Sequence, residues 1–297
     1  MSAKLFTGAA TALITPFKSD GSIDFDGLEE LLEIQIKNGI QAIVVAGTTG
    51  EASTFSFEEY SLLIAKSSFY INHRVPLIAG SGSNNTDVAI KRSLEAQKRG
   101  ADGLLIVTPY YNKTTQDGMV RHYWTIADRV KLPIIMYNVP SRTGIKIEPH
   151  TMKKITERSN VIAIKEASGD ISGLADIRSF CPDLAIYCGN DDQIVPFLSL
   201  GSCGTISVIS NILPKEIQNI HKLFSEKQTE TAAKEQLRLL PLIRALFSEI
   251  NPIPIKGIMN DLGLPAGSPR LPLIPSSDDC INRIKNELSA LGICLKK

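Results

Sequence analysis

One lysine in this sequence stands where an amine can act as a nucleophile. Lys165 closes the apolar run 161–164, whose β-branched residues are typical of a strand buried on both faces. At the polar end of such a strand, a low dielectric can depress the pKa of an amine and free its neutral, nucleophilic form. A lysine that is simply solvated at a strand end is the alternative, so the residues at the other strand ends must decide between the two.

A phenol precedes this lysine by about one strand-helix unit. Tyr137 lies near the end of the apolar run 133–138, so we expect it on the neighbouring strand, at the level of Lys165. A phenol beside an amine is the arrangement of a proton shuttle next to a nucleophile.

Two further segments can bind carboxylates. Thr48 and Thr49, within Gly47-Thr48-Thr49-Gly50, combine two hydroxyls with glycines whose turn can aim backbone N–H groups at a small anion. Arg142 follows Tyr137 on a loop, and its planar guanidinium can hold a second carboxylate. An ordinary turn and an exposed loop arginine are the alternatives.

The elements that must position these residues form eight strand-helix units. The predicted strands span residues 8–15, 42–46, 76–79, 103–107, 133–138, 161–165, 184–188 and 204–207. The helices that follow them are predicted at residues 25–37, 57–71, 86–98, 116–130, 149–156, 171–180, 191–200 and 215–224. Strands without polar alternation predict an α/β fold with a parallel sheet, and eight units predict a closed (β/α)8 TIM barrel. An open doubly wound sheet is the alternative, but the first crossover lacks the glycine fingerprint of that fold.

The last part of the chain carries a different pattern. Further helices are predicted at residues 232–247, 253–262 and 277–291, with prolines between them. We therefore expect a catalytic barrel domain over residues 1–225 and a helical C-terminal extension over residues 226–297.

Composition excludes several classes of partner. The formal net charge is +1 and the basic residues are scattered, which predicts no nucleic-acid or membrane partner. No apolar run has the length of a membrane span and the first residues lack a leader-type core, so we expect a cytoplasmic protein. The cysteines form no CxxC pair and are expected to be free thiols: Cys181, Cys188, Cys203, Cys280 and Cys294.

No metal or nucleotide site is predicted. The four histidines stand far apart and form no HExxH motif, so surface or packing roles are expected. Asp191 and Asp192 lack a third ligand at metal-binding spacing, and a helix N-terminal cap is the preferred interpretation. The segment 80–85 begins like a GxGxxG loop but has Asn85 in place of the third glycine.

Taken together, these residues make the sequence similar to a known family. It resembles the dihydrodipicolinate synthases, which are pyruvate-condensing members of the N-acetylneuraminate lyase family of Schiff-base TIM barrels, over essentially its whole length. The segments that carry the resemblance are Gly47-Thr48-Thr49-Gly50-Glu51, Thr108-Pro109-Tyr110-Tyr111-Asn112, Tyr137-Asn138-Val139-Pro140-Ser141-Arg142-Thr143-Gly144, Ile164-Lys165-Glu166-Ala167 and Asn251-Pro252-Ile253-Pro254.

The resemblance implies a role for each site residue. Lys165 would form an iminium with pyruvate, and a hydroxyl relay would move protons. The members of that relay would be Tyr137, Thr48 and Tyr111, and Tyr111 would be contributed by a neighbouring subunit. Thr48 and Thr49 would hold the pyruvate carboxylate, and the backbone near Gly189 and Ile206 would line the pocket. Arg142 would bind the carboxylate of aspartate 4-semialdehyde.

The resemblance also implies the reaction and the assembly. The product would be 4-hydroxy-tetrahydrodipicolinate, on the route to diaminopimelate and lysine, made without a metal or an organic cofactor. The usual assembly of this family implies a homotetramer built as a dimer of dimers.

One departure concerns feedback by lysine. Members that lysine inhibits usually carry a histidine and an acid at a dimer-interface site, where this chain has Phe57, Tyr60 and Val88. Asn84 and Tyr110 of that site are kept. Because Val88 removes the carboxylate that would pair with the effector's ammonium, we predict weak or absent inhibition by lysine.

Two other functions remain as alternatives. A sister pyruvate aldolase, such as N-acetylneuraminate lyase or a 2-keto-3-deoxy acid aldolase, would keep Lys165 and Tyr137 but read hydroxyls on its acceptor, whereas Arg142 suits a short carboxylate. A catalytically silent, pyruvate-binding regulatory barrel would not need all the hydroxyl groups of the proton relay.

Overall fold

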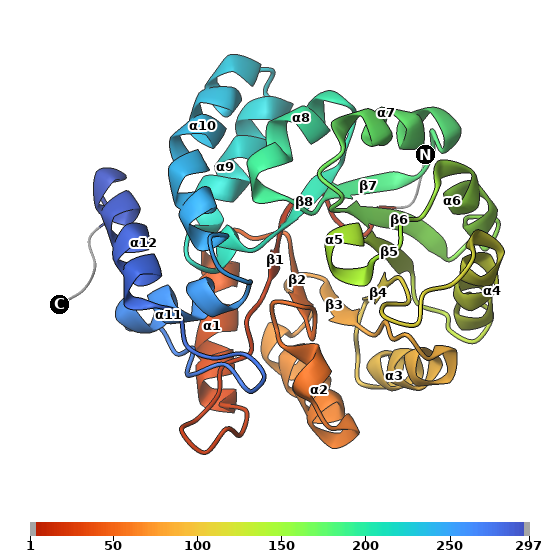
Figure 1. Ribbon diagram of the computed structural model, residues 1–297, viewed down its shortest axis with the longest axis horizontal. Coiled ribbons are helices and arrows are strands. Elements are labelled where there is room, and N and C mark those ends of the chain that lie inside the picture. The colour runs from red at the N-terminus through yellow and green to blue at the C-terminus, as the bar shows by residue number, and fades with distance from the viewer. Residues whose placement is uncertain (1–3, 294–297) are drawn as a thin grey trace.

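The computed structural model describes residues 4–293, and it contains a closed barrel of eight parallel strands surrounded by helices (Figure 1). Each strand pairs with the next along the chain, and β8 pairs back onto β1. The strands are β1 (Gly8–Ala12), β2 (Ala42–Val45), β3 (Leu77–Gly80), β4 (Gly103–Val107), β5 (Ile134–Asn138), β6 (Val161–Glu166), β7 (Ala185–Cys188) and β8 (Gly204–Ser207). The predicted TIM barrel is confirmed.

Helices follow every strand. Those around the barrel are α1 (Phe25–Lys37), α2 (Phe57–Ile71), α3 (Thr86–Lys98), α4 (Gln116–Ala127), α5 (Pro140–Thr143), α6 (Pro149–Ile155), α7 (Ile171–Phe180), α8 (Ile194–Ser199) and α9 (Pro214–Ser225). Several begin at a side-chain cap; Ser56 and Glu59, for example, form a reciprocal capping box at the start of α2.

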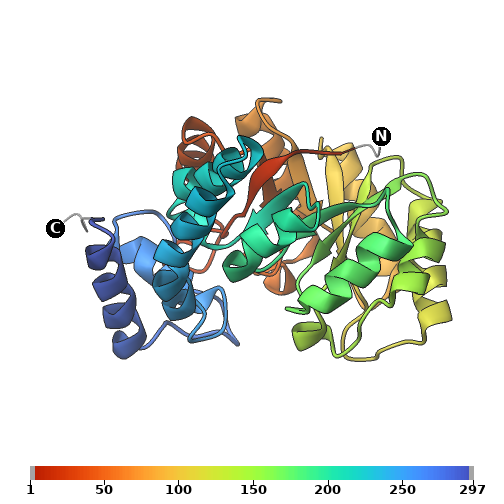
Figure 2. The ribbon, with the colours of Figure 1, turned by 90° about the horizontal axis from the view of Figure 1, so that it is seen from above.

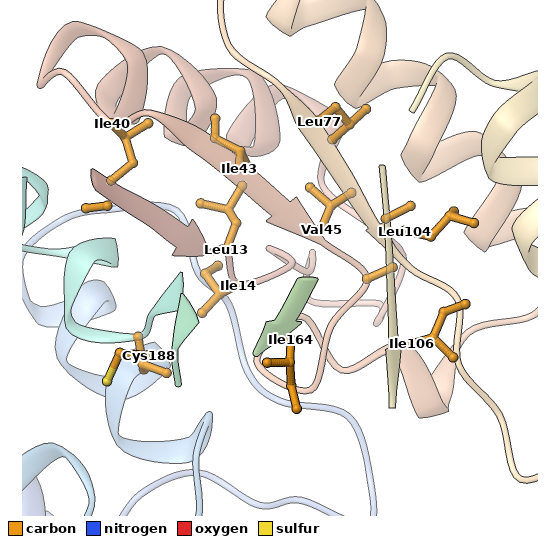
Figure 3. Close-up of a cluster of buried hydrophobic side chains, with 14 of the residues drawn as sticks. Leu13, Ile14, Ile40, Ile43, Val45, Leu77, Leu104, Ile106, Ile164 and Cys188 are labelled. Atoms are coloured by element: carbon orange, nitrogen blue, oxygen red, sulfur yellow. The ribbon is translucent and has the colours of Figure 1, made fainter. Parts of the chain in front are cut away.

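Two apolar cores explain why the strands lack polar alternation. One lies between the strands and the helices; Figure 3 shows part of it, including Ile43, Ile106 and Ile164. The other fills the inside of the barrel and includes Val44, Ile135 and Ala163. Because both faces of every strand are covered, the strands are largely apolar and show no regular polar alternation.

The interior core closes one end of the barrel. Phe6, just before β1, stacks on Tyr187 of β7 with ring centroids 4.2 Å apart, and the Tyr187 hydroxyl donates to the Phe6 carbonyl. This plug lies on the side where the chain enters β1. The free space inside the barrel therefore lies at the carboxyl ends of the strands, where barrel enzymes place their sites.

Three more helices complete the chain. They are α10 (Thr229–Leu246), α11 (Ile253–Asp261) and α12 (Asp278–Ala290). In Figure 2, α12 lies at the edge of the molecule farthest from α4 and α6, and it packs on α10 and α11. The division into a barrel domain and an extension remains a prediction, although segments between these helices also reach the barrel, as described below.

The structure differs from the sequence prediction at short elements. The strand predicted at 8–15 ends at Ala12, because the backbone N–H of Ile14 bonds to the side chain of Asn211 rather than to a strand. The four-residue helix α5 is too short to give a periodic pattern. The helix predicted at 191–200 is a 3-10 turn (Asp191–Gln193) followed by α8, in which Pro196 has no N–H to continue the first turn.

None of the helices among residues 4–293 is both long and apolar enough to cross a membrane. Within the same residues, four cysteines are free thiols: Cys181, Cys188, Cys203 and Cys280. Cys294 lies outside the described residues.

Candidate active site

Lys165 points into the barrel from the end of β6. Its neighbour Ile164 belongs to the outer core and Ala163 to the interior core, so the alternation of a strand turns Lys165 inward. Tyr137 occupies the paired position on β5 and also faces inward. The Lys165 Nζ atom lies 4.5 Å from the centre of the Tyr137 ring, and the two residues are only 6% and 8% exposed. The amine and the phenol are thus neighbours, as predicted.

Gly189, just after β7, makes room for the lysine. A Cβ atom at this position would lie 3.1 Å from Lys165 Cε and 2.6 Å from Ala167 Cβ. Any side chain at this position would therefore crowd the side chain of Lys165.

A buried acid behind the sheet fixes the two strand ends. Glu166 turns away from the barrel interior, and its carboxylate accepts hydrogen bonds of 2.7 Å from Asn138 Nδ2 and of 2.7 Å from the Ser168 N–H. Burial raises the pKa of Glu166, while these two donors oppose the rise. Since Asn138 and Glu166 follow Tyr137 and Lys165 directly, this contact sets the spacing of the phenol and the amine.

A cavity of about 180 Å³ lies over Lys165. It brings together six of the predicted residues: Thr48, Thr49, Tyr137, Arg142, Lys165 and Gly189. No aspartate or glutamate is among its lining residues. A small space with one amine, one guanidinium and several hydroxyls is suited to small carboxylate-bearing substrates.

The loop that carries Thr48 and Thr49 is held by a buried ion pair. Glu51 has a left-handed backbone (φ 57°), and its Oε1 atom lies 2.8 Å from Lys256 Nζ on α11. Both side chains are fully buried, and the lysine also donates to the Thr15 carbonyl. Burial lowers the pKa of Lys256, and the charge of Glu51 opposes this shift.

A second contact comes from Asn251, in the segment between α10 and α11. Its Nδ2 atom donates to Thr49 Oγ1 at 3.0 Å, and its main-chain oxygen accepts from Arg142 Nη2 at 3.2 Å. Arg142 lies on the short helix α5 and is otherwise exposed. One asparagine from the end of the chain therefore contacts both groups predicted to bind carboxylates.

Sequence reasoning assigned no role to Asn251, Lys256 or Glu51. These residues come together from positions about 200 residues apart in sequence, and strand-end position gives no signal for Asn251 or Lys256. The only available signal was that two of them lie in segments shared with the family.

Other predicted site residues lie elsewhere. Ile206 is fully buried in β8, within the interior core, and its side chain does not line the cavity. Tyr111 is 91% exposed and has a left-handed backbone (φ 69°), so its phenol lies outside its own protomer's cavity.

Of the two candidate regulatory residues, only Tyr110 lines a second cavity. This cavity, of about 300 Å³, shares Thr48, Tyr137 and Arg142 with the first one, and Tyr110 lines it. Asn84 precedes α3, and its carbonyl accepts from Asn112 Nδ2 at 3.0 Å.

The acidic pair after β7 has a structural role. Asp191 Oδ2 accepts from the backbone N–H groups of Val208 and Ile209, so its carboxylate caps the short turn that follows β8 rather than its own helix. Across residues 4–293, no cluster of three or more His, Cys, Asp or Glu side chains could hold a metal ion. Asn85, the residue that breaks the GxGxxG pattern, is the N-cap of α3.

A (β/α)8 barrel whose buried lysine faces a tyrosine, hydroxyls and a guanidinium is the arrangement expected of a lyase of the Schiff-base type. Comparison with known proteins gives the particular family. The profile of the dihydrodipicolinate synthetase family matches residues 5–291, and the chain belongs to this family.

Named relatives match this chain over nearly its full length. The 4-hydroxy-tetrahydrodipicolinate synthase of Caldicellulosiruptor saccharolyticus is 50% identical over 293 residues, which cover 99% of each chain. That of Clostridium novyi is 50% identical over 285 residues, 96% of each chain. The crystal structure of dihydrodipicolinate synthase from Thermotoga maritima superposes with a TM-score of 0.95 at 38% identity, covering 98% of this chain and all of the other. The family resemblance is confirmed.

Proposed function

We propose that this protein condenses pyruvate with L-aspartate 4-semialdehyde through a Schiff base on Lys165. The product is 4-hydroxy-tetrahydrodipicolinate, which lies on the route to diaminopimelate and lysine. The observation that carries this proposal is the buried Lys165 facing Tyr137 in a cavity without acidic side chains, in a chain whose full-length relatives bear the name of this reaction.

The first half of the reaction activates pyruvate. The neutral Lys165 amine attacks the C2 carbonyl, the carbonyl oxygen leaves as water, and a protonated imine forms. Because this iminium draws electrons, a proton leaves the adjacent methyl group and an enamine results. Tyr137 lies beside the amine and can carry both protons. Thr48 and the Tyr111 of a neighbouring subunit complete the relay to solvent.

The second half joins the two substrates. The enamine carbon attacks the aldehyde of aspartate 4-semialdehyde, which forms the new carbon–carbon bond and a hydroxyl group. The substrate's own amine then attacks the iminium carbon and displaces Lys165, which closes the ring and regenerates the enzyme. The iminium is the electron sink when the methyl proton leaves and when the substrate's amine attacks, and the aldehyde carbonyl accepts the electrons when the carbon–carbon bond forms, so no step needs a metal or an organic cofactor.

The carboxylates fix the orientation of both substrates. Thr48 and Thr49 hold the carboxylate of pyruvate, and Arg142 holds that of the semialdehyde. The backbone at Gly189 and at Ile206 lines the iminium end of the pocket. Arg142 favours this acceptor over the polyhydroxylated acceptors of sister aldolases.

We also propose the setting in which the enzyme works. The assembly is a homotetramer built from dimers, which supplies each site with Tyr111 from a neighbour. The free, largely buried cysteines suit the reducing cytoplasm. Because Val88 offers no carboxylate to lysine at the position of the regulatory acid, feedback inhibition by lysine is weak or absent.

Borohydride trapping tests the Schiff base directly. The protein is treated with sodium borohydride with and without pyruvate, digested and mapped by mass spectrometry. A pyruvate-derived adduct is expected on Lys165, while Lys256, buried in its ion pair, serves as an internal control and stays unlabelled. Product formation from aspartate 4-semialdehyde, but not from N-acetylmannosamine, then identifies the acceptor. Absence of label on Lys165 refutes the mechanism.

A further inference from the structure

Asn251 carries a buried oxygen without a partner at the edge of the cavity. The residue is 7% exposed, its Oδ1 atom has no hydrogen-bond partner among residues 4–293, and it lines the cavity over Lys165. Buried acceptors are nearly always paired, because burial removes their water. An unpaired one on a residue that lines a binding cavity points to a donor on the ligand.

We infer that Asn251 is a specificity-determining residue, and that its Oδ1 atom accepts a hydrogen bond from the α-ammonium group of the aldehyde substrate. This inference rests on the proposed function, since it concerns how that site chooses its second substrate. Asn251 selects an amino-bearing semialdehyde over one that has only the carboxylate.

The position of the side chain fits this role. The main-chain oxygen of Asn251 accepts from Arg142, the residue proposed to hold the substrate carboxylate. In an α-amino acid, the ammonium and the carboxylate are attached to the same carbon atom. When Arg142 binds the substrate carboxylate, the ammonium therefore lies close to Asn251, which accepts a hydrogen bond from the Arg142 guanidinium.

The charges of the cavity explain why this acceptor matters. Arg142 carries a positive charge, and no acidic side chain lines the cavity to offset it. An ammonium entering this space loses water and meets a like charge. An amide oxygen with a free lone pair supplies one of the hydrogen bonds that the ammonium leaves behind in solvent.

A neutral acceptor also suits the last chemical step. The substrate's amine must lose its proton before it can displace Lys165. A carboxylate beside the ammonium would raise the pKa of that group and hold the proton, whereas an amide oxygen orients the group with a smaller effect.

The other end of the same amide serves the first substrate. Because Asn251 Nδ2 donates to Thr49 Oγ1, the hydroxyl hydrogen of Thr49 remains free to be donated. Thr49 thereby becomes a donor to the pyruvate carboxylate. Asn251 thus contacts the groups that receive both substrates, Thr49 through its side chain and Arg142 through its main-chain oxygen.

The test compares two aldehydes in an Asn251→Ala variant. Aspartate 4-semialdehyde is the substrate, and succinate semialdehyde, which has the same chain and carboxylate but no amine, is the competitive inhibitor. We expect the KM of aspartate 4-semialdehyde to rise at least about tenfold, as loss of a hydrogen bond to a charged group requires, while the inhibition constant of succinate semialdehyde stays within about twofold. Asn190→Ala is the matched control, because that amide also lines the cavity but bonds to Gln193.

A second variant shows whether the effect comes from loss of the substrate contact or from damage to the fold. Asn251→Asp keeps an acceptor oxygen but adds a charge, so discrimination between the two aldehydes is expected to persist while the pH profile of kcat moves to higher pH. Equal losses for both aldehydes in Asn251→Ala, or lost discrimination in Asn251→Asp, would overturn the role of Asn251. If the wild-type enzyme traps pyruvate but gives no product with aspartate 4-semialdehyde, the proposed function itself fails and this inference falls with it.

Discussion

The residues around Lys165 matter more to its chemistry than the lysine itself. A second lysine, Lys256, is fully buried, but its amine is paired with Glu51 and also donates to two main-chain carbonyl oxygens. Lys165 instead faces a phenol ring and a cavity, and no carboxylate accepts from it among the described residues. An amine that lines a cavity and has no ionic partner is accessible to a substrate carbonyl, whereas one held in a buried ion pair has a structural role.

Two buried histidines make the folded protein sensitive to acid. Burial lowers the pKa of His122 and of His221 from 6.5 to about 4, and the Nε2 atom of each has no hydrogen-bond partner in the described part of the chain. The unfolded chain therefore binds protons below pH 6.5 that the folded chain does not bind until about pH 4. Their stabilising contribution is complete above pH 6.5 and is lost as the pH falls through this window.

We predict that His221→Gln reduces this pH dependence. Between pH 7.5 and pH 5, the wild type should lose about 2 kcal/mol of unfolding free energy through His221, on top of what its carboxylates contribute. Urea denaturation at both pH values measures the loss in each protein. His150→Gln is the control, since His150 is exposed and should leave the difference unchanged. Equal pH dependence in the wild type and in His221→Gln would contradict the prediction.

At the scale of elements, apolar runs identified every strand, because both faces of the barrel strands are covered and the apolar pattern is continuous. The same rule placed Lys165 and Tyr137 together, since residues at equivalent strand ends meet at one rim. The apolar pattern failed to predict elements whose limits are set by individual side-chain contacts or by very short length rather than by periodicity. Examples are the four-residue α5 that carries Arg142 and the end of β1, where buried residues continue past the last strand bond.

Contacts from the C-terminal helices to the rim could not be predicted in this way. Lys256 occurs in an amphipathic helix, where a lysine normally indicates the solvent face, yet it is fully buried against Glu51. Only the tertiary fold, which brings α11 against the loop after β2, reveals the partner. The same holds for Asn251 and Thr49.

We predict that the Glu51–Lys256 pair holds this contact between elements. Lys256→Met should lower the unfolding free energy by about 3–5 kcal/mol, because it leaves a buried carboxylate without its counter-ion. The double variant Lys256→Met/Glu51→Leu should recover much of the loss. Lys285→Met is a matched control: Lys285 of α12 pairs with Asp261 at the end of α11, but both side chains are 35% exposed, so a loss under about 1 kcal/mol is expected.

The comparison is made from urea midpoints at one protein concentration. Similar losses for Lys256→Met and Lys285→Met would show that burial of the first pair has no special effect. A double variant as unstable as Lys256→Met would show that the isolated charge of Glu51 is not the cause.

At the scale of the whole molecule, one protomer does not contain the whole proposed relay. Lys165, Tyr137 and Thr48 line one cavity, whereas Tyr111 is 91% exposed on the loop after β4. A large aromatic side chain at that exposure, on a backbone with positive φ, is a feature that a protein interface would bury. The proposed oligomer accounts for this, because a two-fold axis lets two protomers exchange the same residue.

Subunit mixing tests this exchange. Tyr111→Phe and Lys165→Met should each have low activity alone, the first because every site lacks the lent phenol and the second because every site lacks the amine. In a mixed dimer, the protomer that keeps Lys165 receives an intact Tyr111 from its partner, so one of the two sites is complete. Co-expression should therefore restore activity, to about a quarter of the wild-type level for random pairing. If Tyr111 acts within its own protomer, no mixed dimer contains a complete site, and the mixture stays as inactive as its parents.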